Sequence, residues 1–214
     1  MQLKRILPTS LFLVALAAAC LTPAPTLEER TYAPPGPALA RVAVIPFYAH
    51  RSYEGSSRLG GVSAAVATDR TTRHVVEALT ANGIEVVPEE ELDAVIADMP
   101  RSNAAIDAKV FADLAGRELA ATGVILGEVI RFREPRGASP AARRPASVAY
   151  QLTLYEVPDA YKLWTGRFDE TQVIPPQRDD EDPLELSTSV DWKSADEIAI
   201  RGADAVAKAL VRVR

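Results

Sequence analysis

The residues of this chain with the clearest capacity for chemistry are a glycine-rich segment, two histidines and a single cysteine. Gly55 and Gly60 have the glycine spacing of a phosphate-binding P-loop. Gly61 stands where that motif needs a lysine, and Val62 stands where it needs the hydroxyl that binds Mg²⁺. Because both of these groups are missing, the segment is predicted to be a connecting loop and not a nucleotide site.

Histidine is the side chain best suited to acid–base catalysis near neutral pH, so His50 and His74 are the candidates for that role. His74 falls within a predicted helix, where a surface or boundary position is expected. His50 falls in a predicted loop over residues 48–61, and functional residues often lie on loops. No G-x-S-x-G motif marks a serine nucleophile. The sequence favours a protein that is not an enzyme and has no cofactor, with a hydrolase site near this loop as the alternative.

Two charged groups could attract ions or partners. The acidic run at residues 179–182 lacks the alternating ligands and the central glycine of a calcium loop, so a solvated loop without a metal is predicted. A basic group surrounds the tip of a predicted hairpin: Arg131, Arg133, Arg136, Arg143 and Arg144. It is either a solubilising tip or an electrostatic contact with an acidic partner or an anionic envelope surface.

The cysteine, Cys20, ends the apolar run LFLVALAAAC at residues 11–20. Lys4 and Arg5 precede this run, and small alanines lie directly before the cysteine. The run is shorter than the ~20 residues that cross a bilayer as a helix. A basic start, a short apolar centre and a small-residue end are the three parts of a secretory signal peptide, here residues 1–19.

The end of this signal resembles the bacterial lipobox. The resemblance implies that Cys20 becomes the first residue of the mature chain and carries acyl chains such as palmitate, which anchor the protein in a membrane. An ordinary secretory signal with a chance cysteine is the alternative. Leu21 follows the cysteine, where lipoproteins of the inner membrane often have Asp, so the outer membrane is the expected destination. The domain is expected to face the periplasm, and exposure at the cell surface stays open.

The rest of the chain is predicted to be a tether and one domain. Residues 20–40 hold five prolines, which favours an extended tether over a proline-rich docking motif. Residues 41–214 show strand and helix patterns in the order β-α-β-α-α-β-β-β-α. Strands are expected at 42–45, 84–88, 123–132, 146–157 and 161–173, and helices at 62–83, 89–99, 104–120 and 194–213.

This order predicts an α/β (α+β) domain with a mixed sheet of about five strands flanked by helices. Val44 and Leu126 are expected in buried strands, and Ser194 with Glu197 has the spacing of a capping box. In the strand at 123–132, alternation predicts that four apolar residues share one face: Val124, Leu126, Ile130 and Phe132.

The segments VAVIPF, GIEVVP, LAATGVILGEVI and LWTGRF, in this order, resemble a group of bacterial envelope lipoproteins. The group includes the curli-secretion channel lipoprotein and the penicillin-binding-protein activator lipoprotein, and is similar in layout to the N-terminal domain of the Tol translocation protein. The resemblance implies a non-enzymatic, accessory or scaffolding role in envelope assembly or secretion, exerted through a protein partner. An envelope hydrolase is the alternative.

Tyrosine and arginine are the residue types that anchor protein interfaces. Tyr48, Tyr53 and Arg58 in the predicted loop, with Arg143 and Arg144 at the hairpin tip, are therefore the expected partner-binding residues. The net charge of −5 does not favour nucleic acid as a partner.

Overall fold

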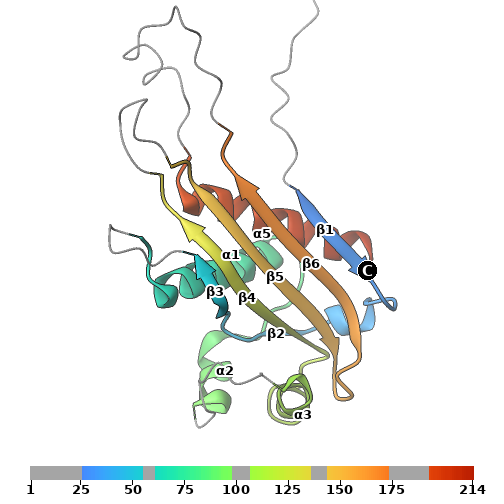
Figure 1. Cartoon of the computed structure of the whole chain (residues 1–214). Helices are drawn as coiled ribbons and strands as arrows, with labels where there is room; N and C mark the ends of the chain where they lie inside the picture. Colours follow the sequence, from blue (N-terminus) through green and yellow to red (C-terminus); the bar gives the residue numbers. More distant parts are fainter. Residues whose placement is uncertain (1–25, 55–60, 98–106, 136–143, 174–192) are drawn as a thin grey trace, which may run out of the picture.

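The computed structural model describes residues 26–54, 61–97, 107–135, 144–173 and 193–214 (Figure 1). Within these residues six strands form one sheet. The strands are β1 (Leu27–Thr31), β2 (Val42–Val44), β3 (Tyr48–Glu54), β4 (Gly123–Arg133), β5 (Ser147–Glu156) and β6 (Lys162–Thr171). The helices are the 3-10 helix η1 (Pro37–Leu39), α1 (Ala64–Ala81), α2 (Glu89–Ile96), α3 (Ala108–Leu119) and α5 (Ala195–Arg212).

The strands lie in the order β1-β6-β5-β4-β2, and β3 also pairs with β4. Consecutive strands β4, β5 and β6 pair antiparallel, as does β1 with β6, whereas β2 and β3 run parallel to β4. Parallel pairing needs a long crossover, and α1, α2 and α3 supply it between β3 and β4. The predicted mixed sheet flanked by helices is thus confirmed.

The helices divide unequally between the two faces of the sheet. α1 and α5 lie side by side behind the sheet in the view of Figure 1 and cover one face along its length. α2 and α3 lie at the lower end of the other face, where Leu92 and Leu119 pack on Val124 and Leu126. Most of β5, β6 and β1 therefore carries a helix on one side only. None of the described helices is both long and apolar enough to cross a bilayer.

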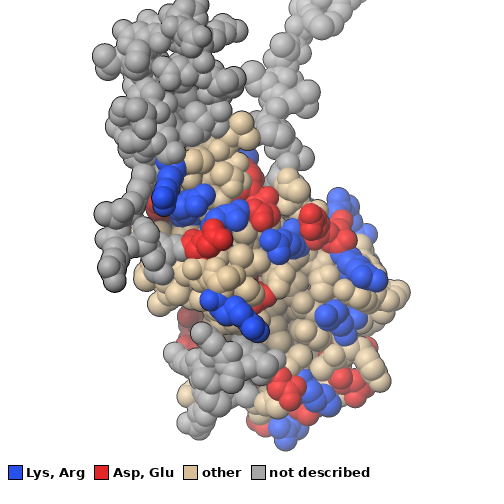
Figure 2. Space-filling model, in the orientation of Figure 1, with Lys and Arg blue, Asp and Glu red and all other residues tan. Residues whose placement is uncertain are grey.

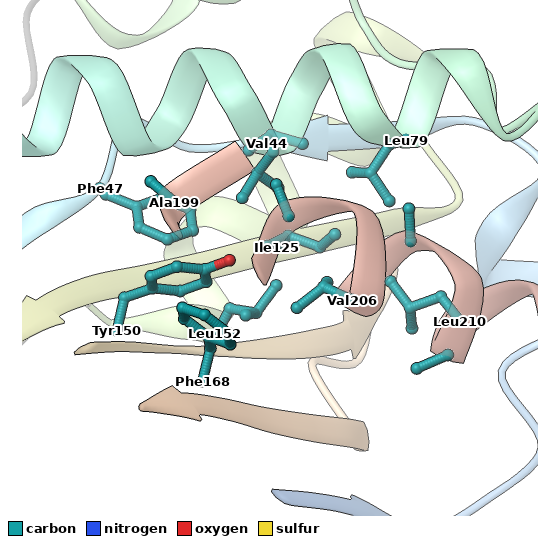
Figure 3. Packing of buried hydrophobic residues seen from close by; sticks show 14 of the residues in the cluster. Val44, Phe47, Leu79, Ile125, Tyr150, Leu152, Phe168, Ala199, Val206 and Leu210 are labelled. Atoms are coloured by element: carbon teal, nitrogen blue, oxygen red, sulfur yellow. The ribbon is translucent and has the colours of Figure 1, made fainter. Parts of the chain in front are cut away.

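The larger core lies between the sheet and the pair α1 and α5, and Figure 3 shows its packing. The Tyr150 ring, on β5, contacts Phe168 at 5.3 Å and Phe47 at 6.2 Å between ring centroids. Its hydroxyl points toward α5 in Figure 3, and a Cβ added at Gly202 would lie only 2.6 Å from that oxygen. Glycine at this position lets the helix approach the aromatic side chains closely.

Several local predictions hold. Val44 and Leu126 are both buried, with 2% and 8% of their surface exposed. α5 begins with the predicted capping box, in which the Ser194 hydroxyl accepts a hydrogen bond from the Glu197 amide and the Glu197 carboxylate accepts one from the Ser194 amide.

The face predicted for the strand at 123–132 needs correction. The β4–β5 register shifts between Val129 and Arg131, so Ile130 is an extra residue in β4. Phe132 consequently lies in the larger core with Val129, whereas Val124 and Leu126 lie in the smaller core on the opposite face.

Residues 27–40 correct the expectation of an extended tether. β1 pairs with β6 along its whole length, with Leu27 opposite Phe168. Leu39, in η1, is completely buried in the larger core. Proline is compatible with η1, because Pro37 occupies its first turn, where the missing N–H costs no hydrogen bond. Residues 1–25, with the predicted signal peptide and Cys20, lie outside the described residues.

Two strand boundaries also differ from the sequence prediction. The segment at 84–88 forms only an isolated bridge, in which Val86 pairs with Val42. β3 occupies part of the predicted loop at 48–61. The sequence did not indicate this strand, because its residues are mostly polar and its partner, β4, comes much later in the chain.

We expect a chain that begins at Arg41 to be less stable than one that begins at Thr26. The shorter chain lacks β1 and the buried Leu39, and loss of a buried leucine alone costs about 2–5 kcal/mol. Urea denaturation of both chains measures the difference. Equal free energies of unfolding would show that residues 27–40 contribute nothing to the folded domain.

We expect Tyr150→Phe to raise the free energy of unfolding by about 1 kcal/mol, since the fully buried hydroxyl has no hydrogen-bond partner within the described part of the chain. Gly202→Ala should lower it, although alanine is the better helix former, because the new methyl group would overlap Tyr150 and Phe168. The penalty of Gly202→Ala should shrink when it is combined with Tyr150→Phe. Strictly additive effects in thermal or urea unfolding would contradict the close contact.

Candidate protein-binding face

The side of β5, β6 and β1 that is turned away from α1 and α5 is the candidate site, and it is called the open face below. On β5, Tyr150 and Leu152 point into the larger core, so Gln151 and Thr153 point to the open face. The strand pairing sets Thr153 opposite Thr165 on β6. Hydroxyl, amide and charged side chains therefore replace apolar ones on this side.

One polar row crosses the whole sheet on the open face. The registers place Tyr48 of β3 beside Glu128 of β4, Glu128 beside Gln151, Gln151 beside Arg167 of β6, and Arg167 beside Glu28 of β1. The five residues come from five different strands, and cross-strand neighbours of this kind lie close enough to interact.

Hydrogen bonds to Glu128 of β4 hold the β3, β4 and β5 members of the row in place. The Gln151 amide donates to the Glu128 carboxylate. Burial of the Tyr48 phenol, together with the negative charge of Glu128 and a hydrogen bond to it, raises the pKa of Tyr48 to about 12. Tyr48 therefore remains a neutral donor across the physiological pH range, and its ring is half-buried against the sheet.

Next to this row, toward the C-terminal ends of β4 and β6, arginines and an aspartate connect the strands. Arg131 of β4 forms an ion pair with Asp169 of β6, and its Nε donates to the Ser147 hydroxyl at 2.6 Å. Arg167 lies on the other side of Asp169, with a nitrogen–oxygen distance of 3.3 Å. These contacts fix the positions of charged groups that would otherwise move freely in solvent.

A hollow of about 440 Å³ opens on the β1 side of the row. Its lining includes Arg30, Thr153, Lys162, Thr165 and Arg167, and we call it the cationic hollow. Figure 2 shows this side of the molecule, with Lys and Arg side chains gathered over the region of β1 and β6 on the right.

A second hollow, of about 770 Å³, lies at the lower end of the molecule between α3 and the turn that joins β5 to β6. Gly116 and Val157 are among its apolar lining residues. The charged groups near it pair with the chain itself, because Lys109 donates to Asp113 at 2.8 Å and to the Pro158 carbonyl at 3.0 Å. It presents no converging set of unpaired reactive groups.

The structure separates the residues that the sequence predicted to bind a partner. Tyr48 lies on the open face, whereas Tyr53 packs against the larger core on the other side and donates to the Val62 carbonyl at 3.0 Å. Arg144 is exposed near the start of β5. Arg58, Arg143 and Cys20 lie outside the described residues.

Neither histidine lines either hollow. His50 is on β3, where its Nδ1 lies 2.6 Å from the Ser52 hydroxyl. His74 joins α1 to the start of α5 through Asp196, with 3.0 Å between its Nε2 and the carboxylate. Within the described residues, no group of three histidine, cysteine or acidic side chains could hold a metal ion.

Sequence reasoning missed the residues of the cationic hollow. The sequence places Arg30 in the predicted tether, and it places Lys162 and Arg167 in a predicted strand whose two faces it does not distinguish. The alternation of the strand at 161–173 was the available signal, since it separates Trp164 and Phe168 from Thr165 and Arg167. The contribution of β1 could not be found in this way, because its partner lies more than a hundred residues away in the sequence.

No family model and no curated protein matches the chain. Among solved structures, the chain is similar to a PelC dodecamer subunit from Paraburkholderia phytofirmans, with a TM-score of 0.48 and 15% identity over 86% of this chain and 98% of that one. It is also similar to lipoprotein GNA1162 from Neisseria meningitidis, with a TM-score of 0.43 and 13% identity over 66% and 86% of the two chains.

A third similar structure is the LpoB C-terminal domain from Salmonella enterica, with a TM-score of 0.41 and 19% identity over 63% of this chain and 84% of that one. The solved structures to which this chain is similar thus include a protein described as a lipoprotein, GNA1162, and the C-terminal domain of LpoB.

Proposed function

We propose that this protein is a lipid-anchored envelope lipoprotein that binds a protein partner through the open face, as a non-enzymatic accessory module of envelope assembly or secretion. The observation that carries the proposal is the one-sided cover of the sheet: α1 and α5 bury one face, while β5, β6 and β1 present polar side chains on the other. Aromatic and arginine side chains, which this face presents, are the types that anchor protein interfaces.

The lipid anchor is proposed from the signal sequence that ends at Cys20. β1 begins at Leu27, about seven residues later, and extended chain spans at most roughly 3.5 Å per residue. The start of β1 would therefore lie within about 25 Å of the bilayer surface. In this arrangement the domain stands close to the membrane and not at the end of a long tether.

From the position of β1 we also propose an orientation of the domain relative to the membrane. Leu27 lies opposite Phe168, so the C-terminal end of β6 is the end nearer the membrane. The turn between β5 and β6 and the helix α3 then point away from it, roughly 33 Å further out for a strand of ten residues. The open face would run between these ends and be accessible to a periplasmic partner from the side. The outer membrane is the proposed location.

We expect a photo-crosslinking phenylalanine analogue at position Tyr48 to capture a protein from intact cells. Tyr48 lies on the open face, and an aromatic replacement keeps its packing. The matched control places the analogue at Ile200, which is 49% exposed on the outer side of α5. Mass spectrometry identifies the captured protein. Capture from Ile200 alone, or equal capture of the same proteins from both positions, would contradict a specific role of the open face.

We expect Cys20→Ala to abolish labelling by a fatty-acid probe and to release the protein from the membrane fraction or leave it unprocessed. Several acyl chains at ~0.8 kcal/mol per buried CH₂ account for stable anchoring, and no described helix could replace them. Density-gradient fractionation of the unaltered protein tests the proposed location. Membrane retention of processed Cys20→Ala protein would contradict the anchor, and co-sedimentation with inner-membrane markers would contradict the location.

A further inference from the structure

We propose that the cationic hollow binds an acidic, carboxylate-rich segment of the protein partner. This inference rests on the proposed function, because it names the chemistry of a partner that the open face would bind. Its basis is a local reversal of charge: three cationic side chains line one hollow on a chain whose net charge is −5. Such a reversal favours association with negative groups and disfavours positive ones.

Two of the three cations have no carboxylate partner within the described residues. The Arg30 guanidinium lies 5.0 Å from the centre of the Tyr32 ring, and the Lys162 ammonium lies 5.7 Å from it. Cation–π contacts of this kind hold a charge in position without neutralising it. Elsewhere Arg41, Arg131, Arg201 and Arg212 each pair with at least one carboxylate. Arg30 and Lys162 are therefore positioned to receive carboxylates from outside the chain.

The acidic residues of the hollow do not cancel this charge. Glu29 points to the side of the larger core, where its carboxylate accepts hydrogen bonds from Arg212 at 2.7 Å and from the Trp164 indole at 3.4 Å. Glu28 is exposed opposite Arg167, which already lies 3.3 Å from Asp169. One free carboxylate, Glu28, thus stands against two cations without a carboxylate partner, Arg30 and Lys162, so the hollow keeps a net positive charge.

The floor of the hollow supplies neutral donors. Thr153 and Thr165 lie directly opposite each other on β5 and β6, and both line the hollow. A carboxylate can accept hydrogen bonds from hydroxyls and take a bidentate contact from a guanidinium. The Tyr32 ring, 47% exposed, adds apolar contact area at the rim. Together these groups match a short acidic segment better than an isolated anion.

The position of the hollow favours a protein over a lipid headgroup. Arg30 and Lys162 lie at the end of the β1–β6 pair opposite Leu27, from which the anchor would extend. Tyr32 lies five residues after Leu27, which corresponds to roughly 17 Å along the sheet. In the orientation proposed above, Arg30 and Lys162 lie further from the membrane than Leu27, and the hollow opens to the side, where a periplasmic partner would lie.

The test uses the full chain, purified in detergent, and a fluorescein-labelled hexaglutamate peptide at about 50 mM salt, where surface electrostatics are weakly screened. We expect Arg30→Gln with Lys162→Gln to weaken binding about tenfold, as measured by fluorescence anisotropy. The matched control is Arg51→Gln with Lys208→Gln, which removes the same charge from exposed positions on β3 and α5 and should change the affinity less than about twofold.

Each other outcome overturns the inference. An equal loss in both double variants would mean non-specific attraction to positive charge, and no loss in the hollow variant would mean that the hollow is not the site. Stronger binding of polygalacturonate, with the same dependence on Arg30 and Lys162, would assign the hollow to an acidic glycan. Crosslinking from Tyr48 is independent of these residues, so capture of a partner there without hexaglutamate binding would leave the proposed function intact and reject the acidic segment alone.

Discussion

α5 packs closely against β5 and β6, and this contact organises the larger core. Gly202 sits where a side chain would overlap Tyr150 and Phe168, and most of the buried residues around it on α5 are alanines, namely Ala195, Ala199, Ala203, Ala207 and Ala209. A helix with so small a face can approach the sheet closely enough to enclose large aromatic rings. Tyr150 lies at this contact between Phe47 and Phe168, so the last helix, the first half of the chain and the central strands meet at one point.

This packing also explains why most of the sheet carries helices on one face only. α1 and α5 share the same face, and together they use the two long amphipathic helices of the described chain. α2 and α3 are shorter and reach only the part of the other face beside β2, the start of β4 and the end of β5. The remaining strands keep hydroxyl, amide and charged residues on their outer side, as an antiparallel sheet in water can. The open face is thus a consequence of how the helices are distributed.

β1 connects the core and the cationic hollow in one short strand, and it also follows the proposed anchor at Cys20. Its start follows Cys20 closely, Glu29 is fixed from the core side by Arg212 and the Trp164 indole, and Arg30 contributes a free charge to the open face. An edge strand with charged residues also resists pairing with another sheet. A lipid attached just before β1 would therefore limit the orientations of the whole domain, because β1 moves with the sheet.

Elements with local signals could be predicted from the order of residues alone. Alternation over residues 146–157 identified β5 with its buried residues, and the spacing of Ser194 and Glu197 identified the start of α5, because both patterns depend on neighbours a few residues away. The predicted mixed sheet followed from the order of these elements. Tyr48 was found for its residue type, although the loop expected around it is largely a strand.

Features that depend on distant partners became visible only in the folded chain. β1 is a strand because β6 offers it hydrogen bonds and Phe168 covers Leu27, and neither group is near it in the sequence. The extra residue at Ile130 moved Phe132 to the other face, which strict alternation cannot foresee. The cationic hollow combines Arg30 with Lys162 and Arg167 across the β1–β6 pair. Its charge became visible only when the register brought these side chains together, since pairing of distant strands is fixed by the whole core and not by local pattern.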